Sequence, residues 1–409
     1  MNRSKLLLVG TLIALGAFVS SSQAAVSFGP PTNIPVGQAP TSVATRDLNQ
    51  DGIADLVTAN LSSSNISVGL GNGDGTFSSA GDYSVGPDGS GPVSVAIGNL
   101  TQDGFLDVVV TNIYTSELSL LPGNGDGTFD PPAFYQVGDN PASVVTGDLN
   151  QDGWDDIAVA NSSSDNVSVL LSDASGTILP AVNYEAEPAS GPSSLAIGNV
   201  SGSSSVDLVV ANNYSSSVSV LTGTGTGAFE LSNTYNVGDQ PRSVAIGDLN
   251  DDSNPDIAVA NGASSSLSIL IADGSGSFSP PATVNAGWMP LSVKIGDLNG
   301  DAEADLAVAN GNPGSVDVFS GNGDGTFDPF VSFETGSGSN SVAIGSFDAD
   351  TFPDLAVTNN GSNTVSILLN GTPTASAAPE VLPFSDQPLG SAGVPQTVLV
   401  SNSTGNGTL

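Results

Sequence analysis

The feature that most constrains this chain is a unit of about 50 residues that recurs seven times. Aligned on the stretch that follows each "SVAIGDLN"-like segment, the copies are 52, 49, 51, 49, 49 and 49 residues apart. They begin at Asp47, Asn99, Asp148, Asn199, Asp248, Asp297 and Ser346. A fixed period of this length indicates a repeat architecture, in which each copy is one supersecondary unit.

Each copy contains short apolar segments separated by turn residues. The fifth copy shows them as "SVAIGDL" (Ser243–Leu249), "DIAVAN" (Asp256–Asn261) and "LSILI" (Leu267–Ile271), followed by "FSPPATVNAG". The segments are rich in Val, Ile and Ala, no helical period is sustained, and Gly, Asn, Asp, Ser and Pro lie between them. This pattern predicts an all-β fold with one four-stranded antiparallel sheet per copy. Seven such sheets around an axis form a β-propeller, and a linear solenoid is the alternative.

The ends of the array favour the closed ring. The last copy stops at "VSILLN" (Val365–Asn370) and lacks its final strand. The segment from Phe28 to Gly37 matches the segment from Phe129 to Gly138, which contains that strand in the second copy. We therefore predict a seven-bladed propeller over residues 26–370, in which the N-terminal strand completes the last blade.

The loop between the first two strands of a copy carries the candidate chemistry. In the first copy it reads D-x-N-x-D-G-x-x-D. Oxygen ligands from side chains at positions 1, 3, 5 and 9 and from the carbonyl at position 7 suit Ca²⁺ better than Mg²⁺, which demands tighter geometry. The candidate ligands there are Asp47, Asn49, Asp51, Ile53 and Asp55. The alternative is that such loops are only Asx-type turns between strands.

The seven loops differ in how many of these ligands they keep. The third copy is intact, the fifth and sixth lose only the glycine, the seventh has Ser346 at position 1, and the second keeps two carboxylates. The fourth has one carboxylate, at Asp207, and is expected to be empty. The further candidate ligands are Asp103, Asp107, Asp148, Asn150, Asp152, Trp154, Asp156, Asp248, Asn250, Asp252, Asn254, Asp256, Asp297, Asn299, Asp301, Glu303, Asp305, Asp348, Asp350, Phe352 and Asp354.

This loop in seven tandem copies resembles the FG-GAP/VCBS repeats of secreted bacterial proteins and of the integrin alpha propeller. The resemblance covers about residues 26–370. It implies a seven-bladed propeller, structural Ca²⁺ in the loops of one face, and ligand recognition often on the other face. Arg46 departs from the pattern, because the other six copies have glycine there, and it is expected to pair with a loop carboxylate.

Two further surfaces have competing interpretations. The "GNGDGTF" segments are read as hairpin turns with a core phenylalanine, rather than as a second metal motif. The face opposite the acidic loops is expected to present strand-end asparagines with nearby aromatics, either as a rim for a sugar or peptide or simply as strand ends. The residues concerned are Asn60, Asn112, Asn161, Asn212, Asn261, Asn310, Asn359, Tyr114, Tyr214 and Trp288.

Both ends of the chain differ from the repeats. Residues 1–24 combine a basic start, an apolar run and a small-residue cleavage site, which predicts a signal peptide and a secreted or cell-surface protein; an uncleaved anchor is the alternative. Residues 371–379 read as a linker. Residues 380–409 resemble the opening strands of an ASPM–SPD-2–Hydin or choice-of-anchor immunoglobulin-like domain, with a disordered tail as the alternative.

Charge and composition limit the functions that the chain can have. After residue 24 only Arg46, Arg242 and Lys294 are basic, against 41 acidic residues. This balance excludes nucleic acid and anionic membranes as partners. The chain has no histidine or cysteine, which excludes His-based triads and thiol catalysis. We expect a monomeric adhesion, ligand-binding or scaffold module for a protein or carbohydrate ligand; a carbohydrate-active lyase or glycosidase is the alternative.

Overall fold

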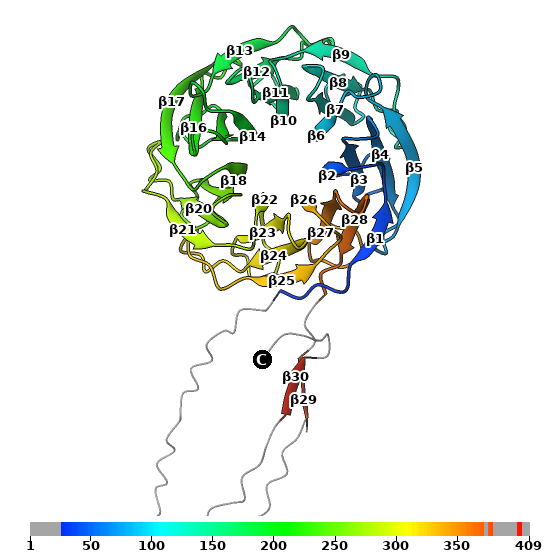
Figure 1. Cartoon of the computed structure of the whole chain (residues 1–409), viewed down its shortest axis with the longest axis vertical. Coiled ribbons are helices and arrows are strands. Elements are labelled where there is room, and N and C mark those ends of the chain that lie inside the picture. The colour runs from blue at the N-terminus through cyan, green and yellow to red at the C-terminus, as the bar shows by residue number, and fades with distance from the viewer. Residues whose placement is uncertain (1–25, 372–374, 379–398, 403–409) are drawn as a thin grey trace, which may run out of the picture.

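The computed structural model describes residues 26–371, 375–378 and 399–402. Seven four-stranded antiparallel sheets surround a central axis (Figure 1). The predicted fold is confirmed, because each sheet is one copy of the repeat and each innermost strand packs against the innermost strand of the next blade. The described part of the chain holds no helix that is long and apolar enough to cross a membrane.

The four strands of a blade have distinct burial. The innermost strands are half-buried: β2 (Pro40–Arg46), β6 (Pro92–Gly98), β10 (Pro141–Gly147), β14 (Pro192–Gly198), β18 (Pro241–Gly247), β22 (Pro290–Gly296) and β26 (Ser339–Gly345). The second strands are buried at every residue: β3 (Asp55–Asn60), β7 (Asp107–Asn112), β11 (Asp156–Asn161), β15 (Asp207–Asn212), β19 (Asp256–Asn261), β23 (Asp305–Asn310) and β27 (Asp354–Asn359).

In the outer half of each blade, solvent exposure increases from the third strand to the outermost strand. The third strands are β4 (Asn65–Gly71), β8 (Glu117–Leu121), β12 (Asn166–Leu170), β16 (Ser217–Gly223), β20 (Ser266–Leu270), β24 (Ser315–Phe319) and β28 (Thr364–Leu368). The outermost strands are β5 (Phe77–Ser84), β9 (Ala133–Gln136), β13 (Val182–Glu185), β17 (Phe229–Asn236), β21 (Ala282–Asn285), β25 (Val331–Glu334) and β1 (Thr32–Pro35). The Val, Ile and Ala side chains of the second and third strands fill seven apolar clusters, most of which join neighbouring blades.

The N-terminal segment closes the ring, as predicted. Strand β1 pairs antiparallel with β28, with Ile34 opposite Val365, and completes the blade of β26 and β27. Phe28 pairs with Asn370 and contacts Phe333 edge-on, with the ring centroids 5.1 Å apart. Closure therefore joins the two ends of the array within one sheet and leaves no blade incomplete.

The segments outside the propeller are described only in small part. Strand β29 (Ala375–Ala378) pairs antiparallel with β30 (Leu399–Asn402). A strand thus falls within the predicted linker 371–379. The predicted signal peptide 1–24 lies outside the described residues, as does most of the predicted immunoglobulin-like segment 380–409.

Candidate functional site

The acidic loops follow the innermost strands and share one hydrogen-bonded conformation. In the first loop the Asp47 carboxylate accepts the N–H groups of Asp51 at 3.1 Å and of Gly52 at 2.8 Å. The Asp51 carboxylate accepts the N–H of Ile53 at 2.8 Å. The third loop repeats this arrangement at Asp148, Gly153 and Trp154. The side chains at positions 1 and 5 therefore point into the same turn.

Left-handed backbone at position 6 of the loop allows this turn. Gly52 and Gly153 have φ of 87° and 91°. Ser253 and Ala302 replace the glycine in two loops and still adopt φ of 67° and 74°, a conformation that a Cβ disfavours. Their N–H groups bond Asp248 at 2.8 Å and Asp297 at 2.9 Å, so the position 1 carboxylate holds the turn in both loops.

The position 9 aspartates are engaged by the backbone. One oxygen of Asp55 accepts the N–H of Leu48 at 2.7 Å and the other accepts that of Gly71 at 2.8 Å. Asp207 makes the same bonds in the fourth loop, where the other carboxylates are missing. Position 9 therefore has a structural role in every blade, which the loop motif alone did not reveal. All seven residues are fully buried: Asp55, Asp107, Asp156, Asp207, Asp256, Asp305 and Asp354.

Burial raises the pKa of six position 9 aspartates: Asp55, Asp107, Asp156, Asp256, Asp305 and Asp354. The pKa of Asp156, Asp305 and Asp354 is raised to about 6, mainly by burial and to a smaller extent by the other carboxylates of the same loop, against the lowering effect of the backbone N–H groups. Within the described residues no three acidic side chains are grouped in a way that could hold a metal. The oxygens at positions 1, 3 and 5 are nevertheless hard donors of the kind that Ca²⁺ takes.

The second and seventh loops, which depart from the full motif, differ from the other loops in their hydrogen bonds. In the second loop Thr101, at position 3, donates its hydroxyl and its N–H to Asp107, so this side chain is used internally. In the seventh loop Asp348 and Asp350 accept the N–H groups at positions 5 and 7. Arg46 is exposed and makes no ion pair among the described residues, so the expected pairing with a loop carboxylate is wrong.

The "GNGDGTF" segments form hairpin turns, as predicted. Asn72 donates its N–H to the Thr76 carbonyl at 2.9 Å, and Asp74 accepts the Thr76 N–H at 3.0 Å. The phenylalanines after two of these turns pack edge-on against another aromatic ring, Phe77 against Phe347 and Phe129 against Tyr83, with ring centroids 5.4 Å apart in both pairs.

The strand-end asparagines are buried, which supports the strand-end interpretation over the alternative of a surface rim. Asn161 donates its amide to Ser168 at 2.8 Å, and the corresponding pairs in five other blades are 2.7–3.0 Å apart. These amides hold the second strand to the third, which is the strand-end interpretation. Tyr114, Tyr214 and Trp288 are about 70% exposed and do lie on that face.

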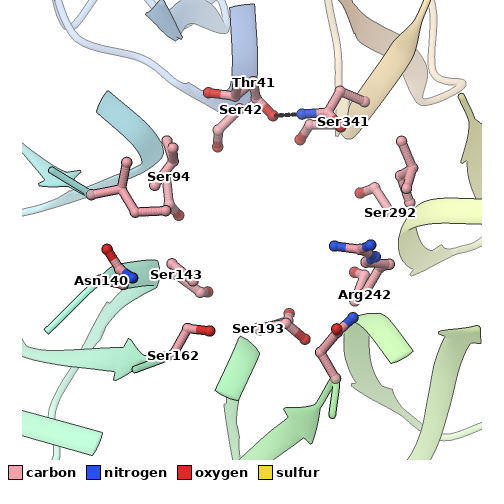
Figure 2. A pocket seen from close by; sticks show the side chains of 18 of the residues that line it. Thr41, Ser42, Ser94, Asn140, Ser143, Ser162, Ser193, Arg242, Ser292 and Ser341 are labelled. Carbon is pink, nitrogen blue, oxygen red and sulfur yellow. Dashed lines mark hydrogen bonds between the residues drawn. The ribbon is translucent and has the colours of Figure 1, made fainter. Parts of the chain in front are cut away.

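A pocket of about 640 Å³ opens at the axis on this face, where the innermost strands begin (Figure 2). Its wall is a ring of serines, one from each innermost strand, with Asn140, Tyr214, Gln240 and Arg242 around it. The sequence pattern concealed this ring, because these serines belong to the "SVA" segments that mark the strands. The ring residues are Ser42, Ser94, Ser143, Ser194, Ser243, Ser292 and Ser341.

Solved structures with this architecture have diverse descriptions. BBS1N in complex with ARL6DN has a TM-score of 0.60 at 14% identity, covering 85% of this chain and 97% of that one. Virginiamycin B lyase from Staphylococcus aureus has a TM-score of 0.58 at 13% identity, covering 83% of this chain and 99% of that one. A protein from Lactobacillus plantarum has a TM-score of 0.60 at 18% identity, covering 75% of this chain and 87% of that one. At these identities the likeness concerns the fold alone.

The family comparison concerns the repeats themselves. No curated protein matches the sequence. The model of the FG-GAP-like repeat matches residues 47–110, 99–159, 199–259, 248–308 and 297–357, each match running from an acidic loop into the next blade. These matches cover most of the propeller, and the chain belongs to the FG-GAP-like repeat family.

Proposed function

We propose that this chain is a secreted, calcium-binding propeller that serves as an adhesion, ligand-binding or scaffold module rather than as an enzyme. The observation that carries the proposal is the shared conformation of the acidic loops, in which the carboxylates at positions 1 and 5 turn inward together. Ca²⁺ would be held by the oxygens at positions 1, 3 and 5 and by the carbonyl at position 7, and position 9 would close the site.

Electrostatics supports a bound cation. The ligand positions hold three carboxylates in five of the seven loops, and in the first and fifth loops the charges at positions 1 and 5 add to the effect of burial in raising the pKa of position 9. A divalent ion would remove this repulsion. Each site would stabilise the fold by about 2.7 kcal/mol when the free Ca²⁺ concentration is a hundredfold above its dissociation constant. Extracellular calcium suits such sites, which agrees with the signal peptide predicted at residues 1–24.

The axial pocket supports binding rather than catalysis. Its wall offers hydroxyl and amide groups with one guanidinium, which suit recognition by hydrogen bonds. A histidine-to-alanine variant of virginiamycin B lyase is catalytically inactive, and this chain contains no histidine. A carbohydrate-active enzyme is the second candidate, favoured by the likeness to a lyase propeller, and it would require turnover of a substrate at this pocket.

Thermal unfolding of the secreted chain in EDTA, CaCl₂ and MgCl₂ tests the calcium proposal. We expect the midpoint to rise in millimolar CaCl₂ and to change much less in MgCl₂. In CaCl₂, Asp152→Ala should show only part of that rise. In EDTA, its unfolding midpoint should be almost the same as that of the native chain. Ser201→Ala, in the loop expected to be empty, is the matched control and should keep the full rise. An identical midpoint in EDTA and CaCl₂ would show that the loops are turns only.

A further inference from the structure

All three basic residues of the propeller lie on innermost strands. Arg46 is on β2, Arg242 on β18 and Lys294 on β22, and these strands border the axis (Figure 1). Each interrupts the repeat, because none of the other blades has a charged residue at the corresponding position. Lys294, for example, corresponds to alanine in five blades and to Val145 in one. Positive charge is thus confined to the inner ring of a strongly acidic chain.

These cations lack internal partners despite the excess of acids. Among the described residues no ion pair involves them, and the one hydrogen bond of the Arg242 guanidinium is to Gln240 at 3.4 Å. The Lys294 side chain is exposed on β22, as expected for a side chain that projects toward the axial channel. Desolvation lowers the pKa of Lys294. An anion at the axis would therefore meet unpaired positive charge.

The serine ring offers hydrogen-bond donors beside Arg242 (Figure 2). Six of the seven hydroxyls accept an N–H from the next blade, as Ser94 does from Val144 at 3.1 Å and Ser143 from Leu195 at 3.2 Å. Because a lone pair is used in this bond, the hydroxyl proton is left to donate to a ligand. The same bonds hold neighbouring blades together, so these donors are fixed in position.

Tyr214 gives the pocket a rigid aromatic edge. Its ring is 71% exposed, yet it lies directly over Gly191, where a Cβ would come within 2.3 Å of it. Gly191 has φ of 60°, and the Tyr214 N–H bonds the Ser190 carbonyl at 2.8 Å. An exposed ring held by the backbone in this way is a platform on which a sugar ring or another flat apolar face can stack.

We propose that the axial pocket binds an acidic saccharide, with Arg242 pairing its carboxylate or sulfate group, the serine ring bonding its hydroxyls and Tyr214 stacking on its ring. Lys294, deeper in the channel, adds attraction for the same anion. A pocket of about 640 Å³ suits a ligand of one or two sugar units rather than a bare ion. The inference deepens the proposed binding role, and its failure would leave the calcium result unchanged.

Calorimetric titration of the secreted chain in CaCl₂ tests this inference. The probes are a glucuronate disaccharide and a sulfated galactose disaccharide, each with its neutral counterpart, and inorganic sulfate. We expect at least one acidic disaccharide to bind about tenfold more tightly than its neutral counterpart, and this preference to weaken in high salt. Equal affinity for both members of each pair, or no binding of either acidic probe, would overturn the proposal. Sulfate binding as tightly as the disaccharides would reduce the site to an ion site and overturn the saccharide assignment.

Variants that restore residues found in other blades keep the fold and separate the contributions. Arg242→Ala, which matches Ala142, should lower affinity for the acidic probe about tenfold and abolish its advantage over the neutral one. Lys294→Ala should weaken binding of the acidic probe by about threefold. Tyr214→Ala should lower the affinity for both the acidic and the neutral probe. Arg46→Gly removes a cation at the opposite end of the strands and should leave binding unchanged. If Arg242→Ala and Arg46→Gly behave alike, the pocket does not recognise the anion.

Discussion

Asp317 on β24 breaks a buried pattern, and its replacement by serine should stabilise the propeller. In the other six blades the corresponding residue is a serine that bonds the strand-end asparagine, as Ser268 bonds Asn261 at 3.0 Å. Asp317 is only 1% exposed, Ser315 donates to its Oδ1 at 3.4 Å, and its Oδ2 has no hydrogen-bond partner. Asn310, the asparagine of this blade, bonds Ser315 instead, at 3.3 Å.

The size of the effect follows from the cost of a buried acceptor without a partner, which is about 1–3 kcal/mol. Asp317→Ser removes that acceptor and restores the bond to Asn310. At neutral pH we therefore expect the free energy of unfolding to increase by about 1–3 kcal/mol. Ser268→Asp, which places the acid in the neighbouring blade, is the matched control and should destabilise the fold by a similar amount.

The advantage of the variant should depend on pH. Burial raises the pKa of Asp317 above 3.8, and the nearby polar groups of Ser332 and Asn310 lower it only in part. The folded state therefore holds the proton more tightly than the unfolded chain, and the native protein loses stability as the pH rises from about 4 through the folded pKa. Asp317→Ser lacks this loss, so its advantage should be smaller near pH 4 than at pH 7.

Urea unfolding in CaCl₂ at the two pH values, followed by circular dichroism, measures both effects. Comparison at constant CaCl₂ separates them from changes in the acidic loops. If Asp317→Ser is less stable than the native chain at pH 7, the carboxylate contributes favourable bonds and the reasoning is refuted. An advantage that does not change between pH 4 and pH 7 would refute the assignment to ionisation.

Three further predictions concern other parts of the fold. Deletion of residues 26–36 should lower the unfolding midpoint sharply because β28 loses its partner strand, and a peptide of residues 26–37 added in trans should restore part of it. Asn161→Ala should cost about 1–3 kcal/mol in urea unfolding, whereas Asn236→Ala on the exposed outer strand β17 should cost under about 0.5 kcal/mol. Asp207→Ala should destabilise the chain by about 3 kcal/mol equally in EDTA and CaCl₂, because three N–H groups lose their acceptor; a calcium-dependent difference would contradict this structural role.

Much of the architecture could be predicted from the repeat alone. The period, the four short segments per copy and the split last unit determine seven blades and their closure by β1, because neighbouring strands in a blade are neighbours in sequence. The acidic loops could also be located, since their residues lie within nine positions of one another. Local patterns suffice wherever the interacting residues are close along the chain.

Other features depend on contacts that only the folded ring creates. The serine ring and the position of Arg242 within it join residues that are about 50 or more positions apart, so no single copy reveals them. The structural roles of Asn161 and Asp207 likewise follow from their burial. An asparagine at a strand end or an aspartate after a loop can be exposed or buried, and the sequence does not distinguish the two. The sequence by itself determined the blades and their loops, and the tertiary structure decided which polar residues support the fold and which remain open to a ligand, since that depends on the packing of one blade against the next.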